Sequence, residues 1–184
     1  SVAVCSAYIF SAATGAELHK LVASNGAALD RFGRRVAVSG DVVVVGAGRN
    51  DDKGNDSGSA YIFNATTGAE HHKLVATDGA ASDYFGESVA VSGDVIVVGA
   101  GGMPDDKGDD SGSAYIFSAT TGAELHKLVP LDGAADDWFG WSVAVSGDVV
   151  VVGAKRIFLA LQHLDDDRSG SAYVFNATTG AQLH

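Results

Sequence analysis

A segment of about 53 residues occurs three times in this chain, and this repetition limits what the chain can fold into more than any other feature. Each copy begins at a Phe-Gly pair and continues with Val-Ala-Val-Ser-Gly-Asp, an apolar run ending in Gly-Ala, a variable acidic loop, Ser-Gly-Ser-Ala-Tyr-Ile/Val-Phe and Thr-Thr-Gly-Ala. The signature pairs are Phe32 and Gly33, Phe85 and Gly86, and Phe139 and Gly140. Residues 6–23 repeat only the second half of the unit. The single region 1–184 therefore divides approximately into 6–23 (partial), 24–77, 78–130 and 131–184.

Each full repeat is predicted to form four β-strands. Ser-Gly-Asp between two Val-rich runs and Thr-Thr-Gly after Tyr-Ile-Phe are hairpin signals, because Gly supplies the positive φ of tight turns. The run 42–45 is four valines without polar alternation, which indicates a strand buried on both faces. The predicted fold is all-β: antiparallel four-stranded blades of a β-propeller, three full and one partial, in an incomplete ring or a fragment. A parallel β-helix is the weaker alternative, because its coils are usually shorter and need no paired hairpins.

Composition excludes several classes of protein. The net charge is −11, from 23 acidic and 12 basic residues, so nucleic acid is not an expected partner. No apolar run approaches the roughly 18 residues that a membrane span needs. Cys5 is the only cysteine, which excludes an intrachain disulfide and a cysteine-based zinc site. The chain opens without Met or a signal-peptide pattern, from which we expect a mature form or a fragment.

The succession Phe-Gly, Val-Ala-Val-Ser-Gly-Asp and Val-Val-Val-Val-Gly-Ala resembles the FG-GAP repeat over residues 6–184. This resemblance implies a propeller like the seven-bladed one of integrin α-subunits, a role in binding or cell adhesion, and a secreted or cell-surface location. Three features depart from that family. Gly48, Gly101 and Lys155 stand where Pro completes Gly-Ala-Pro, and a short Ser-Gly-Asp turn replaces the Ca²⁺ loop that integrin-type repeats often carry between the first two strands. Three and a half blades also do not close a seven-bladed ring.

Most acidic residues are expected on one face. If strands 1 to 4 of a blade run from axis to rim, the 2–3 and 4–1 connections emerge together, and they carry sixteen of the 23 acidic residues. Three interpretations follow: a solvated acidic surface that keeps the protein soluble, Ca²⁺ held by loop oxygens, or direct docking of a cationic partner. The candidate Ca²⁺ ligands are Asp51, Asp52, Asp56, Asp105, Asp106, Asp109, Asp110, Asp165, Asp166 and Asp167.

Two further sets of repeated residues are predicted to have structural roles. Asp30, Asp83 and Asp137 each stand two residues before a Phe-Gly pair, where an Asx-type turn fixes the entry into strand 1. The Phe of each pair is expected to pack between blades, and the following Gly lets the backbone pass closely.

Other suggestive residues also receive structural interpretations. His19, His72 and His126 occupy one repeat position on three different blades, so they cannot converge on one metal ion and a structural role at the rim is favoured. No Gly-x-Ser-x-Gly elbow, phosphate loop or dinucleotide fingerprint is present, and the chain is predicted not to be an enzyme. Asn64 and Asn176 begin glycosylation sequons that give slight support to an extracellular location, although turn chemistry explains them equally well.

The segment 155–164 replaces the usual polar 2–3 loop of the last repeat with apolar residues at helical spacing. Three interpretations stay open for it: docking on its own blade, binding a partner, or an aberrant insertion.

The sequence therefore predicts a non-catalytic binding or adhesion module that contacts a protein or glycan ligand, or Ca²⁺, through its acidic 2–3 and 4–1 loops. The alternative is a structural repeat segment of a longer propeller with no ligand of its own, and a hydrolase is the least favoured. The half blade leaves an open sheet face, which invites self-association that completes the propeller. Two chains would total about seven blades.

Overall fold

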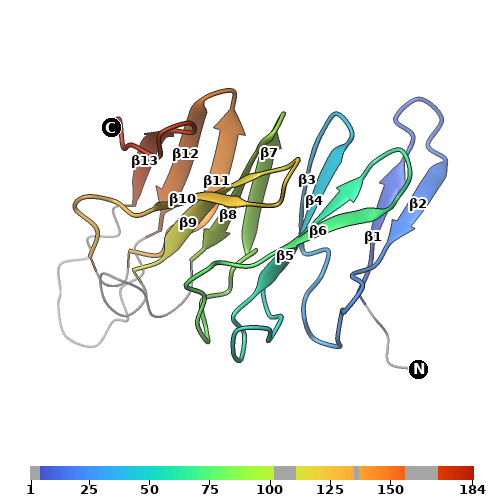
Figure 1. Cartoon of the computed structure of the whole chain (residues 1–184), viewed down its shortest axis with the longest axis horizontal. Coiled ribbons are helices and arrows are strands. Elements are labelled where there is room, and N and C mark those ends of the chain that lie inside the picture. The colour runs from blue at the N-terminus through green and yellow to red at the C-terminus, as the bar shows by residue number, and fades with distance from the viewer. Residues whose placement is uncertain (1–4, 102–110, 135–136, 156–169) are drawn as a thin grey trace.

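The computed structural model describes residues 5–101, 111–134, 137–155 and 170–184, and Figure 1 shows their strands as sheets that lie side by side in chain order. Nothing in these described ranges forms a helix long and apolar enough to cross a membrane. The strands are β1 (Ala7–Phe10), β2 (Glu17–Leu21), β3 (Arg35–Ser39), β4 (Val42–Ala47), β5 (Ser59–Asn64), β6 (Glu70–Leu74), β7 (Ser88–Ser92), β8 (Val95–Ala100), β9 (Ser113–Ser118), β10 (Glu124–Leu128), β11 (Phe139–Ser146), β12 (Val149–Ala154) and β13 (Ser171–Asn176).

The sheets match the predicted repeats. Strands β3 to β6 and β7 to β10 form two four-stranded antiparallel sheets, and β1 pairs only with β2. The last repeat differs from the prediction, because β11, β12 and β13 form a three-stranded sheet. Its fourth strand is reduced to a bridge between Phe175 and Gln182, since only Gln182-Leu183-His184 corresponds to the five residues of β10.

The hairpins form where the turn sequences predict them. Ser39 pairs with Val42 around Gly40, whose φ is +57°, and the 3–4 turn contains Gly68 with a φ of +70°. The two kinds of turn meet at one edge of the blade, because the Ala65 amide donates to the Asp41 carbonyl at 2.8 Å. The valine strand β4 is buried on both faces, as its unbroken apolar run indicates.

Successive blades bury their faces against each other. One apolar cluster joins Val44, Ile62 and Leu74 of the first full blade to Phe85 and Phe117 of the next blade, and two similar clusters lie at the other interfaces. The Phe85 ring makes edge-on contacts with Tyr115 and Phe117, with ring centroids 5.5 and 5.7 Å apart. The prediction that the signature Phe packs between blades is confirmed.

Polar contacts also join neighbouring blades at the rim. A histidine of each outer strand hydrogen-bonds a carbonyl of the next blade's Thr-Thr-Gly turn, and the Gly of that turn packs against its imidazole. The Nε2–oxygen distances are 2.8 Å for His19 to Thr66, 3.2 Å for His72 to Thr120 and 2.9 Å for His126 to Thr178. These histidines therefore hold blades together, in agreement with their predicted structural role.

The signature glycines Gly86 and Gly140 occupy positions that a side chain does not fit. Gly86 has a φ of +94°, and a Cβ at this position would overlap the Ser59 carbonyl oxygen across the blade interface. The turn residue Gly93 is a suitable control, because its φ is +57° and a Cβ there would meet nothing within 4 Å.

We expect Gly93→Ala to lower the free energy of unfolding by about 1 kcal/mol, from backbone strain alone. Gly86→Ala should cost about 3 kcal/mol or more, because steric overlap adds to the strain. Urea unfolding of both variants measures the difference. Equal decreases in unfolding free energy for Gly86→Ala and Gly93→Ala would contradict the close backbone approach at Gly86.

Candidate binding face

The 2–3 and 4–1 loops emerge at the same edge of the blades and are hydrogen-bonded to each other. The amides of Ser82 and Tyr84, in the 4–1 loop, donate to the carbonyls of Asn55 and Asp56 in the preceding 2–3 loop, at 2.8 and 3.0 Å. We call this edge the loop face, which comprises the described parts of residues 22–34, 48–58, 75–87, 101–112, 129–138 and 155–170. The topology predicted from the sequence is confirmed at this edge.

The buried centre of the loop face in the first full blade is polar. Asp30 and Asn50 are 5% and 4% exposed, and the Asn50 Nδ2 donates to Asp30 Oδ2 at 3.0 Å. The other side of the Asn50 amide, Oδ1, accepts hydrogen bonds from Ser59 Oγ and Lys73 Nζ. These contacts satisfy the buried polar groups and fix the two loops relative to each other.

The aspartate before each Phe-Gly pair closes a turn by a hydrogen bond that runs back along the chain, whereas the predicted Asx turn bonds the amide two residues ahead. The Oδ2 atom of each aspartate accepts the backbone N–H three residues earlier, which closes the loop just before strand 1. The nitrogen–oxygen distances are 2.9 Å for Ala27 to Asp30, 2.6 Å for Ala80 to Asp83 and 2.8 Å for Ala134 to Asp137.

Three of the candidate Ca²⁺ ligands lie in the described loop 48–58, and each contacts another group of the chain. Asp51 Oδ1 accepts the Asp56 amide at 2.8 Å, Asp52 pairs with Lys73, and Asp56 Oδ1 lies 3.9 Å from Arg49 Nε. No group of three His, Cys, Asp or Glu side chains that could hold a metal ion occurs in the described ranges. The candidates Asp105, Asp106, Asp109, Asp110, Asp165, Asp166 and Asp167 lie outside the described residues. Calcium binding therefore stays a prediction.

A Tyr–Lys–Asp set at the outer strands was not predicted from the sequence. Tyr115 and Lys127 are paired residues of β9 and β10, and both donate to the Asp78 carboxylate, at 3.0 and 2.8 Å. The equivalent Tyr61 and Lys73 lie beside Asn25 and Asp52. The signal that identifies these sets is the recurrence of Tyr and Lys at cross-strand partner positions.

Burial and hydrogen bonding change the pKa values in this set. The pKa of Asp78 is lowered: partial burial acts to raise it, but the hydrogen bonds from Lys127 and Tyr115 and the Lys127 charge outweigh that effect. The pKa of Tyr115 is raised, first by burial and then by the neighbouring Asp78 carboxylate. Asp78 therefore stays ionised and connects the 4–1 loop to the outer strands.

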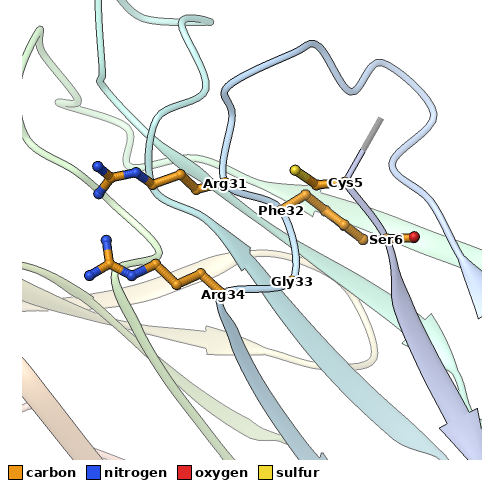
Figure 2. Close-up of a pocket in the computed structure, with 6 residues that line it drawn as sticks. All are labelled: Cys5, Ser6, Arg31, Phe32, Gly33 and Arg34. Atoms are coloured by element: carbon orange, nitrogen blue, oxygen red, sulfur yellow. The ribbon is translucent and has the colours of Figure 1, made fainter. Parts of the chain in front are cut away.

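A small basic pocket lies at the N-terminal end of the loop face. Cys5, Ser6, Arg31, Phe32, Gly33 and Arg34 line a volume of about 600 Å³. Figure 2 shows the Arg31 and Arg34 side chains extended together, away from Cys5. The guanidinium of Arg34 pairs with Glu87 at 2.8 Å, across the interface with the next blade.

The next repeat has a close backbone contact at the place that corresponds to Cys5. Gly58 occupies the place of Cys5 there and pairs with Phe85, and a Cβ on Gly58 would overlap the Phe85 backbone. Cys5 carries that Cβ and is exposed, so this close pairing is not available to the first repeat.

Comparison with known proteins identifies the family. The model of the FG-GAP repeat matches residues 16–63, 69–117 and 123–175, and the chain belongs to this family of β-propeller repeats. No curated protein sequence matches the chain.

Solved structures that share its fold include the following two. The computationally designed Ika8 protein is 22% identical, with a TM-score of 0.56 over 95% of this chain and 41% of its own. The RRP9 WD40 repeats are 15% identical, with a TM-score of 0.60 over 97% of this chain and 44% of their own. This chain therefore spans less than half the length of either propeller-like structure.

The Asp78 set makes stability depend on pH. The folded pKa of Asp78 lies below its ordinary value of 3.8, so its carboxylate contributes stability above that pH and loses the contribution as pH falls through the folded pKa. We expect Asp78→Asn to lower the free energy of unfolding at pH 7 by about 0.5–1 kcal/mol, as for a half-exposed ion pair.

The difference in unfolding free energy between the Asp78→Asn variant and the wild type should fall towards zero in acid. Urea unfolding at a series of pH values from 2 to 7 measures this difference. In a Lys127→Met background the same substitution should cost less. An Asp78→Asn effect that is independent of both pH and Lys127 would show that the contact carries no electrostatic stability.

Proposed function

We propose that this chain is a non-catalytic binding module of the FG-GAP propeller type, and that its loop face docks a partner protein or glycan. The observation that carries the proposal is the hydrogen bonding between the described loops 22–34, 48–58 and 75–87, which joins the first two full blades at the loop face. Because hydrogen bonds hold these three loops in place before a ligand arrives, little of their conformational entropy is lost on binding.

Charge supports a basic partner at this surface. Asp51 and Asp132 are exposed residues in loops of different blades, in a chain of net charge −11. Each also accepts one hydrogen bond within the chain, from the Asp56 amide and from Tyr173. A field of one sign attracts a partner of the opposite sign and accelerates its association. The opposite edge, with its 1–2 and 3–4 turns, carries exposed Asp41 and Asp148 and provides a matched comparison.

A binding role without catalysis agrees with the repeated polar residues, which serve the fold. The three rim histidines bond carbonyls of neighbouring blades, and the aspartates before each Phe-Gly pair close turns. The sequons at Asn64 and Asn176 lie in 3–4 turns, where both Asn Oδ1 atoms accept turn amides. Ser118 caps the equivalent turn, so this role does not require a glycan. An extracellular or cell-surface location stays a prediction.

The docking proposal is tested with a fluorescent peptide of alternating Lys and Ser as the basic probe. We expect it to bind in low salt, to weaken as salt rises, and to bind Asp51→Asn/Asp132→Asn a few-fold more weakly than the wild type. The control Asp41→Asn/Asp148→Asn removes the same charge from the opposite edge and should retain most of the affinity. Equal weakening of both variants would contradict a specific docking face.

The calcium prediction needs a separate measurement. A ligand that binds only the native state raises stability by about 2.7 kcal/mol at 100 times its dissociation constant. A thermal melt in millimolar Ca²⁺ should therefore shift upward against excess chelator, and Mg²⁺ should not reproduce the shift. An unchanged melt would overturn calcium binding and leave the docking proposal intact, since the basic probe requires no metal.

A structural role in a longer propeller, with no ligand of its own, is the second candidate. The two-stranded sheet β1–β2 favours it, because in the described residues this sheet contains only the counterparts of the third and fourth strands of a complete blade. Loss of probe binding to the loop face would favour this candidate.

A further inference from the structure

The first sheet of the chain has an open inner edge. Strands β1 and β2 correspond to β5 and β6, the third and fourth strands of a complete blade. In the complete blade β5 pairs with β4 on its inner side, whereas β1 pairs only with β2 in the described part of the chain. The inner side of β1 therefore presents backbone groups that a further strand can pair with.

In the described residues no inner strand pair lies over the next blade at this place, and apolar side chains of that blade are exposed. Val36 and Val38 of β3 are 59% and 68% exposed. Their equivalents Val89 and Val91 of β7 are partly buried and pack against the core between blades. The exposure thus results from the absent cover and not from the valine positions themselves.

A groove lies between β1 and β3 where this cover is missing. It has a volume of about 530 Å³, and its walls include Tyr8, Phe10, Leu21, Val36, Val38 and Val43. One wall is the open edge of β1 and the other is the exposed face of β3 and β4. An extended segment with apolar side chains on one face fits both walls.

The chain itself indicates what covers such a face. At the next interface the place over Val89 and Val91 is filled by the hairpin β3–β4, from which Val42 and Val44 point into the shared core. At the following interface, Val95 and Val97 of β8 lie in the same apolar cluster as Val143 and Val145. The groove continues this established interface, with its inner hairpin absent.

We propose that the groove between β1 and β3 binds the inner β-hairpin of another FG-GAP unit, which adds a strand to the open edge of β1. The register follows from β4 and β5, where Val43 pairs with Phe63 and Val45 with Tyr61. If the incoming strand has the sequence Val-Val-Val-Val-Gly-Ala, its first and third valines face Val36 and Val38. The second and fourth valines pair with Phe10 and Tyr8.

A second copy of this chain is a poorer occupant. Its last blade offers suitable chemistry, because Val149 and Val151 of β12 are exposed. That β12 strand is bonded to β13, however, and β13 would have to occupy the space that β1 and β2 fill. Each inner hairpin of the described chain already has at least one outer strand of its own. The groove thus fits a hairpin that arrives without outer strands, whether or not the loop face binds a ligand.

The test uses a fluorescent 16-residue peptide with the sequence of residues 86–101, which contains one complete inner hairpin. Fluorescence anisotropy measures its binding to the whole chain. We expect saturable 1:1 binding that weakens about tenfold or more when Val38→Lys places a charge in the groove. The control Val151→Lys, at the exposed face of the last blade, should bind the peptide as the wild type does.

Peptide variants test the register. Lys at the two positions derived from Val95 and Val97 should abolish binding, because these side chains face the groove. Lys at the positions derived from Ile96 and Val98 should weaken it less. Equal effects of the two peptide variants, or equal effects of Val38→Lys and Val151→Lys, would overturn the proposal.

Two further measurements keep the proposal testable if the free peptide aggregates. The same hairpin, joined ahead of Ser6 through the sequence of residues 48–58, should raise the Tm of the chain by several degrees. A fusion that carries Lys at the positions derived from Val95 and Val97 should leave Tm unchanged. Light scattering of the chain alone distinguishes the other occupant. A dimer that both Val38→Lys and Val151→Lys dissociate would mean that a second copy covers the groove, and the hairpin proposal would be wrong.

Discussion

The structure depends on the packing of one blade face against the next. A single four-stranded sheet of this composition has apolar side chains on both faces, because β4 and β8 consist of valine or isoleucine before their Gly-Ala ends. Such a sheet is stable only when both faces are covered, so each repeat requires a neighbour on each side. Phe85 packs in the apolar cluster between two blades, and the adjacent Gly86 allows the backbones to approach.

That requirement explains the distribution of polar residues. Side chains at the rim and at the loop face join one repeat to the next, as His72 does through the Thr120 carbonyl and Arg34 through Glu87. Other polar side chains close turns inside a repeat, as Asp83 does. Many described residues that look chemically reactive in the sequence therefore have bonding partners in the fold. Exposed loop residues such as Asp51 and Asp132 are available for recognition as well, because each uses only part of its carboxylate within the chain.

The fold was predictable because each repeat contains local sequence signals for its own turns and strands. Gly40 and Gly68 mark the two hairpins, and unbroken valines mark the strand buried on both faces. The candidate site was less predictable. The sequence places Asp52 and Asp78 in acidic loops, but only the paired strands show that Lys73 and Lys127 reach them. Cross-strand partners lie many residues apart, and repeat spacing alone does not indicate which side chains meet.

The sequence by itself determined the repeat length, the strand order within a blade and the edge at which the acidic loops gather, because local turn chemistry and apolar periodicity encode all three. Tertiary structure decided which of those acids are neutralised and which faces stay open. The exposure of Val36 and Val38 is the clearest case, since Val89 and Val91 lie in the same repeated motif and are covered. Burial depends on the neighbouring blade, and a repeated motif cannot specify whether that neighbour is complete.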